Sequence, residues 1–324
     1  MHMDLKKYFF TVVLFFLFFK NMEAQNTTKL SAISIDSKNV IKHLQTIASD
    51  KMQGRKVGTS GIELAATYIE NEFLKLGLTT FNKAKNYRQN FERFGIKLSN
   101  IVGVLEGSTK KEEWIMISAH YDHLGILKPV DGDSIANGAD DDASGVAAVL
   151  ALAEYWTKKR GNKRTIVFAA FSGEEKGLWG STYFGTQVEP KKCVAGINIE
   201  MIGKDSKFGP NSAFLTGYEK SNLGKIMQKN LKGTAYKLHP DPYKSFKLFY
   251  RSDNASLARL GVPAHTFSTC PIDKDRYYHT VNDELETLNS KSLTNTIQAI
   301  ALGIESIINA NDTPTRVDIE FLNN

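Results

Sequence analysis

The chain has 324 residues, with 41 basic and 35 acidic side chains and a formal net charge of +6. The basic residues are scattered along the sequence rather than gathered in runs interleaved with aromatic residues, which argues against nucleic acid as a partner. About 300 residues remain once an N-terminal targeting segment is set aside, enough for one large α/β domain with its own core.

The first 25 residues have the pattern of a secretory signal peptide. Two lysines precede an apolar run over residues 8–19, which is too short to span a bilayer as a mature helix, and small and polar residues such as Ala24 and Gln25 follow. We therefore predict a signal peptide over residues 1–25 and a mature chain over residues 26–324. The mature protein is expected in the periplasm or outside the cell, without stable membrane association. An uncleaved membrane anchor is the alternative.

The remaining chain alternates amphipathic helices with short β-branched strands. We predict helices over residues 39–47, 61–76, 146–156, 178–184, 257–260 and 290–308. We predict strands over residues 100–105, 114–119, 165–171, 194–199, 213–216 and 264–268, and we interpret the stretch 79–92 as an edge hairpin. Strand 165–171 has no polar side, as expected when both faces of a sheet are covered. The alternation predicts a single-domain α/β fold with a mixed, mostly parallel sheet and helices on both faces.

Two cysteines, Cys193 and Cys270, are predicted to stay unpaired. An exported protein is free to form a disulfide. However, Cys193 precedes one predicted strand and Cys270 follows another, so the two thiols would lie at opposite ends of a parallel sheet. That separation exceeds the reach of a disulfide. The stability of the protein is therefore expected to come from its hydrophobic core.

Ionisable residues gather where the buried strands end, which is where open α/β sheets bind their ligands. His120 and Asp122 follow strand 114–119. Residues i and i+2 of an extended chain point the same way, so His120 can face a metal while Asp122 holds its imidazole in place. On its own, this His-x-Asp pattern is equally typical of a surface turn.

Three adjacent carboxylates, Asp140, Asp141 and Asp142, lie between small residues and lead into helix 146–156. A solvated run of charge is the ordinary explanation for such a triplet. Here the small neighbours indicate a tight turn at the start of a helix, where the helix dipole favours negative charge. Packing three mutually repelling acids into that turn requires a cation, which favours a metal site.

Glu174 and Glu175 directly follow the most apolar strand. Adjacent residues in a turn point apart, so one glutamate can bind a metal while the other takes a proton from water, the two roles that metal-dependent hydrolysis needs. Acid enrichment at a helix N-terminus is the alternative.

Glu200 and His279 indicate little when each is considered alone. Together, however, two imidazoles and three carboxylates suit zinc, and five ligands suit two ions bridged by one carboxylate.

Two segments, Gly-Ala-Asp-Asp-Asp-Ala-Ser-Gly and Ser-Gly-Glu-Glu-Lys-Gly-Leu-Trp-Gly-Ser, occur in this order and spacing. They resemble the co-catalytic zinc exopeptidase family that includes secreted bacterial leucyl aminopeptidases. Its relatives include plasma glutamate carboxypeptidase and the glutaminyl cyclases. The resemblance spans residues 40–305 and includes the loop and helix over residues 54–76. It identifies residues 26–324 as a zinc exopeptidase domain, with no room before His120 for the protease-associated domain that some relatives carry.

The resemblance implies two zinc ions per chain, held by His120, Asp141, Glu175, Glu200 and His279. Asp141 would bridge the two ions. His120 and Glu200 would complete one site, and Glu175 and His279 would complete the other. Glu174 would be the general base, and Asp122 would be the partner of His120.

Two local features also follow from the resemblance. The family often has a cis peptide within the acidic turn, which we expect between Asp141 and Asp142. The family usually has Asp where this chain has Glu200. Because Glu is one methylene longer, the site must be slightly wider or the carboxylate must approach at a different angle.

Residues that flank the expected site are candidates for a substrate pocket: Met201, Tyr250, Asp253, Cys270 and Tyr278. Their apolar and aromatic character favours a hydrophobic substrate residue. Acids near the site suit an α-amine, whereas Arg251 would suit a carboxylate. We therefore predict a monomeric zinc metallopeptidase that hydrolyses the N-terminal bond of peptides. The alternatives are a carboxypeptidase or dipeptidase of the same family, a single-zinc glutaminyl cyclase, and a binding module without activity.

Overall fold

The computed structural model describes residues 33–320. The predicted signal peptide over residues 1–25 lies outside the described residues. Among the helices of the described range, none is both long and apolar enough to cross a membrane. The helices and strands described here belong to the compact unit that begins at Ile35.

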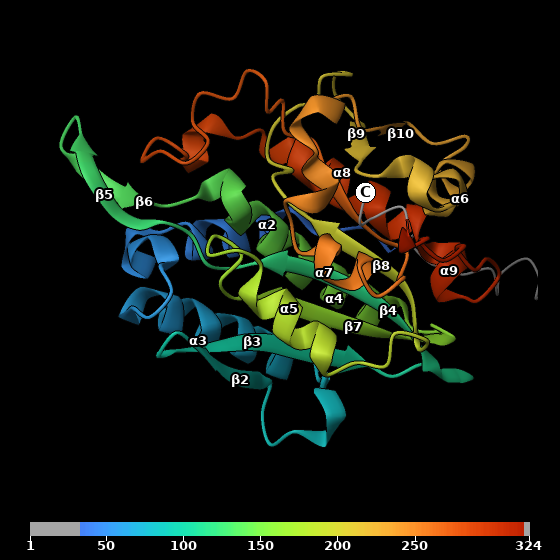
Figure 1. Ribbon diagram of the computed structural model, residues 1–324. Coiled ribbons are helices and arrows are strands. Elements are labelled where there is room, and N and C mark those ends of the chain that lie inside the picture. Colours follow the sequence, from blue (N-terminus) through green and yellow to red (C-terminus); the bar gives the residue numbers. More distant parts are fainter. Residues whose placement is uncertain (1–32, 321–324) are drawn as a thin grey trace, which may run out of the picture. The chain divides into compact units, whose positions relative to one another are not determined.

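A mixed nine-stranded sheet forms the centre of this unit (Figure 1). Its strands are β1 (Thr79–Thr80), β2 (Arg88–Arg93), β3 (Ile96–Leu105), β4 (Lys110–His120), β7 (Arg164–Phe171), β8 (Cys193–Ile199), β9 (Ser212–Leu215), β10 (Lys237–Pro240) and β11 (Ala264–Ser268). They pair in the order β1-β3-β7-β4-β8-β11-β9-β10, and β2 also pairs with β3. The central strands β7, β4, β8 and β11 are parallel, whereas β3 and β9 run antiparallel to their central neighbours.

Helices cover both faces of the sheet. They are α2 (Ser37–Ile47), α3 (Ser60–Lys75), α4 (Gly145–Lys159), α5 (Trp179–Thr186), α6 (Leu223–Asn230), α7 (Asn254–Ala258), α8 (Ser290–Gly303) and α9 (Glu305–Ile308). α5 and α7 pack together on one face, and α4 packs on the other face with α2, α3 and α8 (Figure 1). α4 is apolar on nearly all sides because it lies between the sheet and these helices. The predicted fold class is therefore confirmed.

The stretch 79–92 does not form the predicted hairpin with itself. β1 and β2 both pair with β3, and a short 3-10 helix, Phe81–Lys83, separates them. The hairpin lies one strand later, between β2 and β3. Phe94 and Gly95 both have positive φ there, as a tight two-residue turn requires.

Cys193 begins β8 and Cys270 follows β11, and both thiols are buried and free. The prediction that they stay unpaired is confirmed. β8 and β11 are parallel neighbours, so one thiol lies at the start of its strand and the other beyond the end of its own. The prediction of unpaired cysteines rests on this separation of the two thiols along the sheet.

The parallel register brings the ends of β4 and β7 side by side, with His120 opposite Phe171. The turn that follows β7 therefore lies next to His120. After β4 the chain forms a hairpin of β5 (Gly125–Val130) and β6 (Asp133–Ala136), which the sequence patterns do not predict. It then returns to His120 as the acidic turn that precedes α4. Distant segments thus meet beyond the strand ends, as expected for this fold.

A buried arginine in the segment between α2 and α3 connects that segment to the end of β4 and to the start of the acidic turn. The side chain of Arg55 is fully buried and donates hydrogen bonds of 2.5–3.0 Å to four main-chain carbonyls, those of Ile47, Tyr121, Asn137 and Gly138. Two of these carbonyls lie just before the acidic turn, and one lies next to His120. A buried guanidinium needs such acceptors, so Arg55 fixes the approach of β4 and the acidic turn to each other.

We predict that Arg55→Lys lowers the free energy of unfolding by about 3 kcal/mol, because a single ammonium cannot serve four buried carbonyls. Urea denaturation followed by circular dichroism measures this loss. The control is Arg88→Lys, which removes an arginine that pairs with Glu63 and Glu70 near the surface and should cost about 1 kcal/mol or less. Equal losses in the two variants would contradict the structural role of Arg55.

Candidate metal centre

Side chains from five segments converge beyond the carboxyl ends of the central strands. Each segment is a strand end, the turn before α4, or the loop between β11 and α8. These side chains are His120, Asp141, Glu175, Glu200 and His279. The structure therefore places together all five residues that the resemblance assigns as metal ligands.

Asp141 lies at the centre of the arrangement. Its Oδ1 is 3.2 Å from Nε2 of His120, and its Oδ2 is 3.2 Å from Nε2 of His279. Ligand atoms of Asp141, His120 and Glu200 lie within 4.8 Å of one another, so the longer side chain of Glu200 does not carry its carboxylate away from the group. Asp141 is also close to Glu175. The carboxylate of Asp141 thus belongs to two donor groups, one with His120 and Glu200 and one with Glu175. This is the position expected of a bridging ligand.

The second group contains an imidazole that the sequence reasoning missed. His279 Nε2 is 3.2 Å from Oε2 of Glu175, and His123 Nδ1 is 2.9 Å from Oε1 of the same carboxylate. The His123 side chain is buried, and its Nδ1 is 3.8 Å from Oδ2 of Asp141. The only sequence signal for His123 is that it follows His120 by three residues. Because the backbone is irregular there, the sequence does not show which way the side chain points.

These residues fit a divalent metal ion. Nε2 of His120, Nε2 of His123 and Oε2 of Glu200 are buried and have no hydrogen-bond partner among the described residues. Buried polar atoms are nearly always satisfied, and a cation between the two donor groups would satisfy several of them at once. Imidazole nitrogen and carboxylate oxygen are ligands that zinc accepts.

The three acids of the turn have three different surroundings. The carboxylate of Asp142 accepts main-chain N–H groups of His120, Gly145 and Met201 at 3.0–3.3 Å. The carboxylate of Asp140 accepts the N–H of Gly203 at 2.7 Å, and its other oxygen lies 3.3 Å from Nζ of Lys204. Only Asp141, between them, faces the histidines.

The peptide bond between Asp141 and Asp142 is cis, which confirms the expectation from the resemblance. The carboxylate of Asp283 accepts the N–H groups of Asp140 and Asp141, each at 3.0 Å. Asp283 lies four residues after His279. These hydrogen bonds therefore couple the acidic turn to the loop that presents His279.

Asp122 acts differently from the expectation in one respect. His120 Nδ1 lies 3.1 Å from the main-chain oxygen of Asp122 but 3.8 Å from its carboxylate. The carboxylate instead accepts the N–H groups of Gly173, Glu174 and Glu175, at 2.8, 3.0 and 3.3 Å. Because these three donors occupy it, the carboxylate shapes the turn after β7, and the main chain orients His120.

The two adjacent glutamates of that turn have opposite electrostatic surroundings. Burial raises the pKa of Glu174 well above its ordinary value, and the nearby carboxylates of Glu200 and Asp253 raise it further. Burial and Asp141 also act to raise the pKa of Glu175, but hydrogen bonds with His123 and His279 bring it below its ordinary value. Neighbouring groups whose pKa values are driven apart are typical of a proton acceptor beside a ligand.

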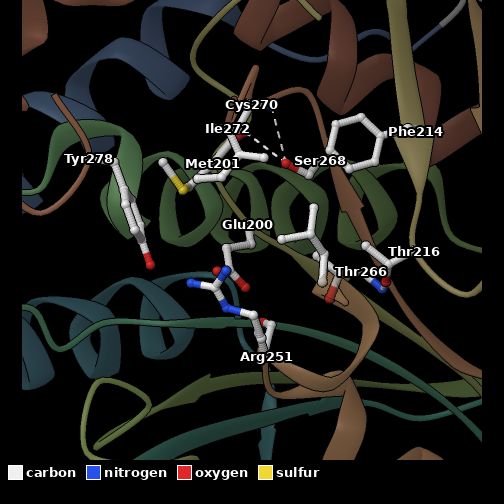
Figure 2. Close-up of a pocket in the computed structure, with 12 residues that line it drawn as sticks. Glu200, Met201, Phe214, Thr216, Arg251, Thr266, Ser268, Cys270, Ile272 and Tyr278 are labelled. Atoms are coloured by element: carbon white, nitrogen blue, oxygen red, sulfur yellow. Dashed lines mark hydrogen bonds between the residues drawn. The ribbon is translucent and has the colours of Figure 1, made fainter. Parts of the chain in front are cut away.

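A pocket of about 470 Å³ lies beside Glu200 (Figure 2), and it is called the closed pocket here because it is less open than the neighbouring cavity. Three of the predicted pocket residues, Met201, Cys270 and Tyr278, line it. Ile272, which also flanks the site in the sequence, lines it as expected, and the further lining residues include apolar and hydroxyl side chains that sequence reasoning missed: Phe214, Thr216, Leu248, Thr266 and Ser268. They come from β9, β11 and the loops beside them, where a strand buried on both faces does not show which face meets a cavity.

An open cavity of about 830 Å³ joins the metal centre to the surface. Tyr250 lines this cavity rather than the closed pocket, together with Glu174, Glu175 and Glu200. Asp253 lines neither cavity, so its assignment to the pocket is wrong. Its side chain is buried behind the acids, where burial raises its pKa to about 6.

The fold and the carboxylate–imidazole centre define an α/β protein built to bind metal at its strand ends. Residues 100–304 match the model of peptidase family M28, and the chain belongs to this family of zinc metallopeptidases. A probable zinc metalloprotease of Pyrenophora tritici-repentis is 35% identical over 167 residues, which are 49% of this chain and 37% of that relative. The chain thus spans little more than a third of the length of this relative.

Two solved structures show the same fold in proteins of different activity. The LapA aminopeptidase of Legionella pneumophila aligns with a TM-score of 0.66 and 23% identity, over 84% of this chain and 72% of its own. The glutaminyl cyclase of Porphyromonas gingivalis aligns with a TM-score of 0.69 and 16% identity, over 85% of this chain and 100% of its own. At these identities the likeness establishes the fold, and the activity must be argued from the site.

We predict that His123→Ala weakens metal binding by about 10- to 100-fold, because a side chain that holds the ligand Glu175 is lost. Titration of the metal-free protein with zinc against a chromophoric chelator measures the affinity. His239→Ala is the matched control, since His239 stacks on Phe208 instead of facing the centre. An unchanged zinc affinity in His123→Ala would show that this imidazole has no part in the centre.

Proposed function

We propose that the chain is a two-metal exopeptidase, an aminopeptidase that removes the N-terminal residue of peptides with zinc as its metal. The observation that carries the proposal is the position of Asp141, shared by two donor groups, next to Glu174. The carboxylate of Glu174 lines the open cavity and makes no hydrogen bond or salt bridge with the described residues. It is therefore available to a water molecule and a substrate.

The two donor groups divide the metal-binding role. His120, Asp141 and Glu200 would hold one ion, and Asp141, Glu175 and His279 would hold the other. Zinc held by these residues would supply Lewis-acid chemistry, polarising the scissile carbonyl and lowering the pKa of a bound water toward about 7. His123, hydrogen-bonded to Glu175, would keep that carboxylate in place.

Glu174 would carry the proton transfer. Its carboxylate accepts a proton from the attacking water and then donates it to the nitrogen of the leaving residue. A raised pKa suits both steps, because the group must accept a proton and hold it until the peptide bond breaks. Asp122 supports this role by hydrogen-bonding the N–H group of Glu174.

Attack at the amino terminus is favoured by charge and by shape. Burial raises the pKa of Glu174 and of Glu200, and repulsion between acids adds to this: Glu200 and Asp253 raise the pKa of Glu174 further, and Asp253 raises that of Glu200. The α-ammonium of a substrate would relieve this repulsion. The closed pocket beside Glu200 is lined by apolar and hydroxyl side chains, which suit the side chain of a first residue, and the rest of the peptide would then lie in the open cavity.

We predict that Glu174→Gln lowers kcat at least a hundredfold while both metal ions stay bound, since the amide cannot accept a proton. Steady-state kinetics on leucyl-p-nitroanilide, with metal content by mass spectrometry, measures both quantities. Glu189→Gln, a change at an exposed glutamate paired with Lys192, is the control. A turnover near that of the unmodified enzyme would rule out Glu174 as the base.

We also predict that the protein binds two zinc ions per chain and cleaves peptides only when the terminal amine is free. Leucyl-alanine and its N-acetyl derivative are compared before and after treatment with a chelator, and again after zinc is restored. His279→Ala should lose zinc. Cleavage of the blocked peptide would indicate a carboxypeptidase, and one zinc with cyclisation of N-terminal Gln would indicate a cyclase.

A further inference from the structure

Two arginines of the open cavity have no polar partner among residues 33–320. Arg251 and Arg259 both line this cavity and are both exposed. Neither guanidinium makes a hydrogen bond or salt bridge with the described residues. By contrast, five other arginines hydrogen-bond within the protein: Arg55, Arg88, Arg164, Arg276 and Arg316. Two unpaired guanidinium groups beside the metal centre therefore require an explanation.

The nearest acids do not serve as their partners. Glu175 is held by His123 and His279, and Glu200 belongs to the first donor group with His120 and Asp141. The glutamates of the cavity thus belong to the metal centre, whereas its two arginines make no ion pair with the described residues. A free cation in such a cavity is suited to an anionic group that arrives with the substrate.

The two arginines lie at different distances along the path of a substrate. Arg251 lines both the closed pocket and the open cavity, and Figure 2 shows its side chain and that of Glu200 pointing into the same space. Arg259 lines only the open cavity, with Leu178 and Tyr250. Arg251 therefore borders the junction of the two spaces, and Arg259 borders the outer one.

The proposed function orients the substrate across this junction. If the first residue fills the closed pocket and its amine meets the acids, the residue after the scissile bond must lie in the open cavity, against Arg251 and Arg259. Guanidinium groups bind carboxylates by two parallel hydrogen bonds. Leu178 and Tyr250 line the same cavity and offer apolar surface beside the two guanidinium groups.

We propose that Arg251 and Arg259 select substrates that carry a carboxylate on the leaving residue. This inference rests on the proposed aminopeptidase function and names its substrate class. The carboxylate has two chemical sources, the free C-terminus of a dipeptide or an acidic side chain at the second position of a longer peptide. Every dipeptide with a free C-terminus carries this group on its second residue, whereas a longer peptide carries it there only as an acidic side chain, so the enzyme is assigned mainly to dipeptides.

Three substrates separate these sources: leucyl-alanine, leucyl-alaninamide and leucyl-aspartic acid amide, the last with a free side-chain carboxylate only. The variants are Arg251→Gln, Arg259→Gln and the double change. The matched control is Arg160→Gln. Arg160 is exposed and follows the last residue of α4, about 22 Å along the helix from the acidic turn by its rise per residue.

We expect leucyl-alanine to be cleaved with a kcat/KM about tenfold or more above that of leucyl-alaninamide. Each single arginine change should reduce this ratio severalfold, the double change should abolish it, and the control should leave it unchanged. The loss should appear mainly in KM, because the arginines bind the substrate without taking part in proton transfer. High salt should also reduce the ratio.

The possible outcomes distinguish this inference from the function on which it rests. Equal cleavage of acid and amide, unaffected by either arginine change, would overturn the inference and leave the aminopeptidase function intact. A preference for leucyl-aspartic acid amide alone would support a carboxylate site but assign it to acidic side chains. Failure of the zinc-loaded protein to cleave any of the three would overturn both proposals.

Discussion

Buried negative charge at the strand ends must be compensated, and the surrounding structure is organised by that requirement. An ionised carboxylate taken out of water costs several kcal/mol unless hydrogen bonds or cations replace its hydration. The acidic turn places three such groups side by side. Asp142 is compensated by main-chain N–H groups, and Asp140 by Gly203 and Lys204. Asp141 is left facing imidazoles, and the buried Nε2 atoms of His120 and His123 have no hydrogen-bond partner among the described residues, so a cation would complete these surroundings.

This division of roles connects the fold to the chemistry. Parallel strands deliver His120 and the turn after β7 to the same edge of the sheet, and Asp122 shapes that turn through three main-chain hydrogen bonds. Asp283 then joins the acidic turn to the loop of His279. Three of the five ligands are therefore held by a further group: His120 by the main-chain oxygen of Asp122, Asp141 by the carboxylate of Asp283, and Glu175 by His123. Such preorganisation keeps Glu174 free while its neighbour Glu175 is fixed.

Much of this could be predicted from the sequence, because apolar runs locate buried strands and the parallel sheet fixes where their ends lie. The acidic turn and the Glu174–Glu175 pair follow from these patterns and from the family resemblance.

Other features depend on three-dimensional packing. Arg55 belongs to a turn-rich loop, where an arginine normally reaches solvent, and its burial depends on carbonyls up to 83 positions away. His123 lies in an irregular segment, and the pocket wall of Phe214 and Thr266 comes from strands that are buried on both faces. Asp253, adjacent in sequence to pocket residues, turns out to be buried behind them.

The central claim is that one shared carboxylate joins two metal sites beside a free glutamate. Anomalous diffraction from crystals of the zinc-loaded protein, collected above and below the zinc absorption edge, tests it most directly. The account predicts two zinc peaks, one bound by His120 and Glu200, the other by Glu175 and His279, with Asp141 binding both. A single peak, or two peaks that do not share Asp141, would contradict it.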